Sequence, residues 1–216
     1  SNANYAWILH MLSHLKPLKG VAGFLLANGA LGDSDALAIR QKLIENDKVE
    51  AIIILPRELF ITTDISVTLW ILNQNKKGGE YHGRTLRNRE HEILFMDLRQ
   101  WTENHVSGEQ KKKVRLDDTQ IARAAEIYHT WQSEGTDGTN YAVPELYRSV
   151  GIEEIKNNGW TLVPSKYIEF IDHDLDIDFP AEMARIQNEM KEILAQEKES
   201  QKMLENAFKG IGYGID

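Results

Sequence analysis

Residues 21–56 of the sequence read VAGFLLANGALGDSDALAIRQKLIENDKVEAIIILP. This stretch holds two short apolar runs, Val21–Ala27 and Val49–Leu55. Between them, apolar residues recur at helical spacing over residues 36–44, after a candidate N-cap at Asp33-Ser34. This strand–helix–strand order predicts an α/β layer in which parallel strands are joined by a right-handed crossover, with Val21–Ala27 buried on both faces.

Three segments extend this layer. Trp7–Leu15 has the apolar spacing of an amphipathic helix. The loop of residues 56–64 is too short for a crossover helix, so the next apolar stretch, Ile65–Leu72, is predicted to run antiparallel to its neighbour. A polar stretch follows, and Glu92–Leu98 is predicted to form a fourth strand.

The second half of the sequence has a different character and is predicted to be mainly helical. Asp117 and Gln120 have the spacing of a capping box before an apolar helical face. A short helix is expected at residues 152–157, closed by Asn158-Gly159. Pro180 begins a long charged helix that extends to about residue 208. Its apolar seam is formed by Met183, Ile186, Met190 and Ile193.

The predicted organisation has four parts. Residues 1–3, Ser-Asn-Ala, are typical of a remnant left by tag removal, and the native sequence is expected to begin near Asn4. Residues 4–100 form the α/β part, residues 101–179 a mixed helical and loop extension, and residues 180–216 a long interaction helix with its tail.

Composition narrows the class of protein. The 216 residues are 42% hydrophobic and 27% charged, which is typical of a globular protein with a real core. The chain has no cysteine, which excludes disulfides, thiolate zinc sites and cysteine nucleophiles. No apolar run is long enough to span a bilayer, so a cytoplasmic location without membrane contact is expected. The net charge of −8 indicates that any DNA contact is local or needs a partner.

Several motifs resemble binding sites but lack required residues. A pair of histidines at helical spacing lacks the glutamate of a zinc-hydrolase helix. A series of alternating aspartates lacks the glycine and glutamate of a calcium loop, and the glycines at the C-terminal end lack a flanking strand and helix. No cofactor-binding, metal-binding or catalytic set is therefore predicted. The basic run is predicted to be a solvated loop, with phosphate contact as the alternative. These motifs are His10 with His14; Asp172, Asp174, Asp176 and Asp178; Gly210, Gly212 and Gly214; and Lys111-Lys112-Lys113 with Arg115.

Phe60 is the candidate functional residue. It lies in the loop between two predicted strands, after Leu55-Pro56, where open α/β sheets tend to place ligand-facing residues. Enzymes that act on a base within DNA extrude it and hold it against aromatic faces. A core residue and a base-stacking residue are both compatible with this pattern.

The segments together resemble the C-terminal half of the modification subunit of type I restriction-modification systems, over nearly the whole chain. The matching stretches are Asn4-Tyr5-Ala6-Trp7, residues 20–29, 39–45, 49–56, Leu59-Phe60 with Thr62-Thr63, 69–73, 93–99, 152–155, 159–162 and Lys166-Tyr167.

This resemblance implies the distal half of a class I, Rossmann-like, S-adenosylmethionine-dependent methyltransferase sheet with one antiparallel strand, followed by an α-helical region that ends in a long helix. It implies methyl transfer to adenine N6 in DNA and identifies Phe60 as similar to the aromatic residue that stacks on the flipped adenine. The family's Gly-rich cofactor motif and Asn-Pro-Pro-Phe motif are expected upstream of Asn4. The chain alone is therefore expected to bind no S-adenosylmethionine and to be inactive. Asp64 stands where relatives often carry glycine, so the chain departs from the family pattern in this loop.

The partners implied by the resemblance are a specificity subunit, bound through the C-terminal helix, and DNA in the full complex. A restriction subunit could also take part, and the unpaired edge of Val21–Ala27 leaves self-association open. The alternative function is a non-catalytic interaction module that uses the last helix and the acidic linker. A third hypothesis, an unrelated nucleotide-binding α/β enzyme, is disfavoured by the lack of a phosphate loop.

Overall fold

The computed structural model describes residues 3–104, 113–171 and 178–212. The chain forms two compact units, residues 1–171 and residues 172–216. Ser1, Asn2, Lys111, Lys112, the three acidic positions before Asp178, and Gly214 lie outside the described residues, so the predictions made on them stay predictions.

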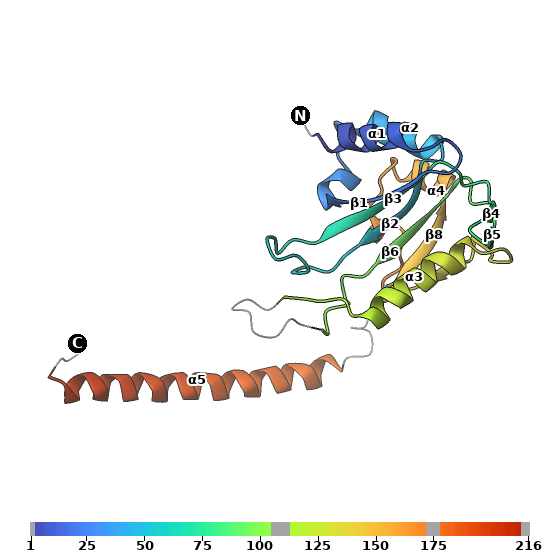
Figure 1. Cartoon of the computed structure of the whole chain (residues 1–216). Coiled ribbons are helices and arrows are strands. Elements are labelled where there is room, and N and C mark those ends of the chain that lie inside the picture. The colour runs from blue at the N-terminus through green and yellow to red at the C-terminus, as the bar shows by residue number, and fades with distance from the viewer. Residues whose placement is uncertain (1–2, 105–112, 172–177, 213–216) are drawn as a thin grey trace. The chain divides into compact units, whose positions relative to one another are not determined.

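The first unit is built on a mixed sheet whose strand order is β1-β3-β2-β6-β8-β7, beside a separate β4-β5 hairpin (Figure 1). The described elements of this unit are α1 (Asn4–His14), β1 (Val21–Ala27), η1 (Asn28–Leu31), α2 (Leu37–Glu45), β2 (Val49–Ile54), β3 (Val67–Asn73), β4 (Gly79–Tyr81), β5 (Arg84–Leu86), β6 (Glu92–Asp97), α3 (Asp118–Gln132), β7 (Ala142–Val143), β8 (Tyr147–Gly151), α4 (Ile152–Asn157) and η2 (Pro164–Lys166).

Helices cover both faces of this sheet, so the unit has three layers. In Figure 1, α1 and α2 lie against one face and α3 lies against the other. The first core joins Ile8 of α1 and Leu43 of α2 to Trp70 of β3, and the second packs Trp131 of α3 against Met96 of β6. The central strand β2 is buried along its whole length, because it contributes alternate side chains to both cores.

The predicted antiparallel strand is confirmed. β3 pairs antiparallel with β1 on one side and with β2 on the other, while β2 and β6 pair in parallel. Consequently β1, β2 and β6 all run in the same direction, and their carboxyl ends meet at one edge of the sheet. This α/β architecture is the predicted one.

The expectation that β1 is buried on both faces in a parallel pair is wrong. β1 is an edge strand whose exposure alternates along its length, and Val21 and Leu25 are 43% and 46% exposed. Because β3 lies between β1 and β2, the side chains of β1 on the first-core face pack while those on the other face remain exposed. The continuous apolar run concealed this alternation.

The helix ends are mostly as predicted, with one correction. Asp117 accepts from the backbone N–H of Gln120 at 2.8 Å, and both halves of the capping box are present. α4 ends at Asn157, with Asn158 as its C-cap and a left-handed Gly159 after it. Asp33 does not cap α2, which begins at Leu37. Instead its carboxylate accepts from the N–H of Asp35, and this local turn delays the helix.

Two pairs of strands were not predicted. The polar stretch after β3 contains the β4-β5 hairpin, and the extension after residue 100 adds β8 and β7 to the main sheet. β8 is a second strand that runs opposite to β2, since it pairs antiparallel with β6. The four-part division of the chain stays a prediction.

The second unit contains α5 (Phe179–Gly210), a 32-residue helix that confirms the predicted long helix. Asp178 caps it by accepting from the N–H of Ala181. None of its described residues is buried. Among the described residues, no helix is both long enough and apolar enough to cross a membrane.

Candidate functional site

The candidate site is the edge of the sheet where β1, β2 and β6 end. In open α/β sheets, ligands bind outside the carboxyl ends of the strands. The loop of residues 55–66, here called the β2–β3 loop, extends from this edge (Figure 1). It carries Phe60.

The β2–β3 loop is a folded hairpin extension. The N–H of Leu55 donates to Val67 O at 2.9 Å and the N–H of Glu58 to Asp64 O at 3.3 Å, which prolongs the pairing of the two strands. Phe60 forms a β-bridge with Thr63 and is half-buried. Ile61, at the tip, is 80% exposed. The structure therefore holds Phe60 one step behind the tip, with part of its side chain accessible.

Lys113 ties this loop to a distant part of the chain. Its side chain is 6% exposed, and Nζ lies 2.6 Å from Oδ1 of Asp64. The N–H of Val114 donates to Glu58 O at 3.1 Å, so both sides of the loop base are held. A charge-assisted bond of this length to a buried cation restrains the loop. Lys113 is therefore not part of the solvated basic run that was predicted, whereas Arg115 is exposed.

A second charged pair lies at the end of β6. Arg99 Nε donates to both carboxylate oxygens of Asp97, at 2.9 and 3.0 Å, and Asp97 is 4% exposed. The hydrogen bonds that Arg99 donates to this carboxylate raise the pKa of Arg99. Arg99 is thus a permanent cation fixed at the carboxyl edge. The backbone N–H of Leu98 donates to Ile54 O, which places this pair beside the β2–β3 loop.

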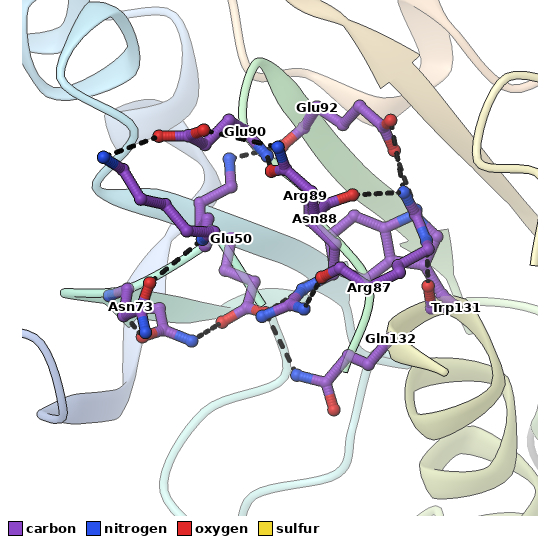
Figure 2. Close-up of polar contacts among 12 residues, drawn as sticks. Glu50, Asn73, Arg87, Asn88, Arg89, Glu90, Glu92, Trp131 and Gln132 are labelled. Atoms are coloured by element: carbon purple, nitrogen blue, oxygen red, sulfur yellow. Dashed lines mark hydrogen bonds and ion pairs between the residues drawn. The ribbon is translucent and has the colours of Figure 1, made fainter. Parts of the chain in front are cut away.

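The opposite edge of the sheet holds a buried polar cluster centred on Glu50 (Figure 2). Its Oε1 accepts from Arg89 Nε and from Gln132 Nε2, each at 3.0 Å, and its Oε2 accepts from Asn73 Nδ2. Glu50 and Arg89 have fully buried side chains. Among the described residues, Arg89 Nη2 has no hydrogen-bond partner. Because β2, β3, α3 and the segment before β6 each contribute a member, the cluster fixes their relative positions.

Lys76 is buried beside this cluster. Nζ lies 3.2 Å from Asp47 Oδ1 and also donates to the carbonyls of Val49 and Glu92. Burial lowers the pKa of Lys76, while the Asp47 carboxylate opposes that shift. Three acceptors surround the ammonium group, and hydrogen bonds of this kind are strongest when the donor is charged.

The remaining candidate motifs form no site in the described part of the chain. His14 Nδ1 lies 2.8 Å from the carbonyl oxygen of His10, as on an ordinary helix face. Over residues 3–104, 113–171 and 178–212, no group of three or more His, Asp or Glu side chains could hold a metal ion. Gly210 is the last residue of α5 and lies in no phosphate loop.

Sequence reasoning proposed Phe60 as a site residue but did not identify the residues that support its loop. Lys113 is separated from Asp64 by 49 positions, and nothing in the local sequence marks it as buried. Glu50 offered a signal, because a lone carboxylate within the apolar run Val49–Leu55 has to be paired when buried. Its cation, Arg89, could not be identified without the fold.

Comparison with known proteins assigns the chain to a protein family. The pattern of the N-6 DNA Methylase family matches residues 1–175. The chain is 34% identical over 217 aligned residues to the HindI methylase subunit of a type I restriction enzyme from Haemophilus influenzae, covering 98% of this chain and 44% of that protein. It is 28% identical to the MjaIX methylase subunit of Methanocaldococcus jannaschii, covering 98% of this chain and 36% of that protein. The chain thus spans less than half the length of these relatives.

Solved structures have the same fold. A type I restriction-modification methyltransferase subunit from Streptococcus thermophilus superimposes with a TM-score of 0.60 at 25% identity, over 78% of this chain and 31% of that one. The EcoKI M protein superimposes with a TM-score of 0.52 at 16% identity, over 96% of this chain and 48% of the other. This second likeness supports the fold alone.

Proposed function

Because the chain belongs to the N-6 DNA methylase family, we propose that it is part of the modification subunit of a type I restriction-modification system, which methylates adenine N6 in DNA. The observation that carries this proposal is the half-buried Phe60, held in a braced hairpin at the carboxyl edge of the sheet. An extruded base needs an aromatic face in a fixed position. The β2–β3 loop supplies one.

The methyl donor of this reaction would be S-adenosylmethionine. At the carboxyl edge, the carboxylates of Asp97 and Asp64 are paired with Arg99 and Lys113, so among the described residues both contribute to holding the fold. We propose that the remainder of the longer protein supplies the cofactor pocket and the catalytic motif. This chain would then supply the base-stacking residue and be inactive alone.

The role of Phe60 can be tested in the longer protein with its specificity subunit. Replacing Phe60 with alanine removes the aromatic face, and a stacking contribution of about 1–3 kcal/mol corresponds to a loss of roughly 5- to 150-fold in methylation rate. Phe60→Tyr keeps the ring and should retain most activity. Ile61→Ala, on the same loop, is the matched control.

A fluorescent readout separates stacking from folding. With 2-aminopurine at the target position, the extruded base should be quenched against Phe60 and brighter in the Phe60→Ala protein. Equal activity and equal fluorescence in wild type and Phe60→Ala would remove the base-stacking assignment.

The alternative function is an interaction module, favoured by the exposed apolar seam of α5. Met190 and Ile193 are 60% and 64% exposed, which is typical of a helix that packs against a partner. A solved structure with the same fold concerns complex assembly of the type I system. We propose that α5 binds the specificity subunit, with a restriction subunit as a further partner, in the cytoplasm. Unchanged binding after deletion from Pro180 onward would remove this assignment.

A further inference from the structure

A cavity of about 490 Å³ opens at the amino-terminal edge of the sheet, near the start of β1 and the end of β3. The β4-β5 hairpin and α3 complete its wall. Its size lies within the range of roughly 300–1,000 Å³ that is typical of small-molecule sites. Seven residues of strand, at about 3.3 Å each, separate this edge from the β2–β3 loop, so the two sites lie roughly 20 Å apart.

The charges that line the cavity favour an anion. Lys19 and Arg84 line it together with one carboxylate, Glu80, in a chain whose net charge is −8. Lys19 makes no ion pair with any residue that the structure describes, whereas Glu80 accepts a hydrogen bond from Thr85 at 2.6 Å. Arg84 is held in place because its Nη2 donates to the carbonyl oxygen of His129 at 2.9 Å. The cavity is therefore a local excess of positive charge on an acidic protein.

Aromatic and amide groups favour a planar heterocycle. Tyr81, which is 41% exposed, and Tyr128 both line the cavity. Gln132 is 6% exposed, and its amide nitrogen is committed to Glu50 at 3.0 Å. Its Oε1 receives only a long contact of 3.5 Å from Arg84, and Figure 2 shows this oxygen directed away from the Glu50 cluster. A buried acceptor with so weak a partner can accept a stronger bond from a ring N–H or amino group.

We propose that this cavity binds a nucleoside monophosphate, with the base against Tyr81 and Tyr128 and hydrogen-bonded to Gln132 Oε1, and with the phosphate at Lys19 and Arg84. The site is distinct from the β2–β3 loop and takes no part in the methyl transfer proposed above. Its occupant would brace the β4-β5 hairpin against α3, because groups from both line the cavity.

Calorimetric titration of the 216-residue chain with AMP tests this proposal. We expect saturable binding with a stoichiometry of one, and weaker binding of adenosine and of inorganic phosphate, because each lacks half of the contacts. Tyr81→Ala and Lys19→Glu should each weaken AMP binding by about tenfold or more. Both positions are exposed, so these variants should remain folded, as circular dichroism would show.

Lys16→Glu and Trp7→Ala are the matched controls, since both residues are exposed and neither lines the cavity. Their AMP affinity should equal that of wild type. Absence of saturable binding at millimolar AMP would overturn the proposal, and so would binding that neither Tyr81→Ala nor Lys19→Glu weakens. Adenosine or phosphate binding as tightly as AMP would also overturn it, because a nucleotide site needs both halves of the ligand.

Discussion

At the residue scale, Glu50 is the most consequential buried group. Its carboxylate lies in the central strand, and three side chains from three other segments donate to it. A buried ion pair is weak support for stability as such, but removing one partner leaves an uncompensated charge. The cluster therefore specifies how β3, α3 and the segment before β6 assemble around β2.

Replacing Arg89 with methionine should be severely destabilising. The free energy of unfolding is expected to fall by about 3–5 kcal/mol, because Glu50 loses its buried cation. Urea denaturation measures this. Lys77→Met, which removes a 3.9 Å ion pair with Glu90 from a 76% exposed side chain, is the matched control and should change stability by less than about 0.5 kcal/mol. Equal effects of the two variants would contradict the role given to Glu50.

Buried tyrosine side chains should make the free energy of unfolding fall at alkaline pH. Burial, with a smaller effect of the Glu50 carboxylate, raises the pKa of Tyr128. Above the pKa of about 10 of an unfolded tyrosine, the unfolded state releases a proton that the folded state keeps, so the free energy of unfolding decreases by about 1.4 kcal/mol per pH unit for each such residue.

Urea midpoints between about pH 10.5 and 12 should therefore decline less steeply in Tyr128→Phe than in wild type. This range lies above the ordinary pKa of lysine, so the lowered pKa of Lys76 does not contribute there. Burial also raises the pKa of Tyr5, which should sustain a residual decline in the variant. An identical slope in both proteins would show that Tyr128 ionises freely in the folded state.

At the element scale, the capping box of α3 is a local device that the sequence predicts and the structure confirms. Asp117→Ala removes the acceptor for the Gln120 N–H and for Asn104 Nδ2. The expected loss is about 1–2 kcal/mol in the free energy of unfolding, measured by thermal denaturation. Asp118→Ala, one position later, should cost only a few tenths of a kcal/mol through the helix dipole. A larger effect at Asp118 would contradict the cap assignment.

The free edge of β1 should make the chain self-associate. Among the strands that the structure describes, β1 pairs with β3 alone, and its exposed Leu25 adds apolar surface along the other side of the strand. Exposed edges pair with other strands. Light scattering should detect association that Leu25→Lys reduces, whereas Ile121→Lys, at a 53% exposed position on α3, should not reduce it. A monomer at all concentrations would contradict this prediction.

Elements with a strong local pattern could be predicted, and those defined by pairing could not. α3, α5 and the antiparallel β3 follow from spacing, caps and loop length. β4 and β5 are three residues each, in a stretch without alternation, so only their pairing defines them. β1 was identified, but its place at the sheet edge depends on the insertion of β3, which no property of residues 21–27 encodes.

At the scale of the whole molecule, the two edges of the sheet carry different groups. The carboxyl edge carries the β2–β3 loop and the Asp97–Arg99 pair, where we propose contact with an extruded base. The amino-terminal edge carries the Glu50 cluster and the cavity proposed to bind a nucleotide. The position of Phe60 in the loop between two strands could be predicted from the sequence, whereas the ion pair of Asp64 with Lys113 arises from tertiary structure alone.

We propose that this chain holds the base-contacting part of a methyltransferase and that the rest of the longer protein supplies the pocket for the methyl donor. Calorimetric titration with S-adenosylmethionine tests it most directly, applied to the 216-residue chain and to the longer protein. We expect saturable binding by the longer protein and no saturable binding by this chain. Stoichiometric binding of S-adenosylmethionine by the 216-residue chain would contradict the account.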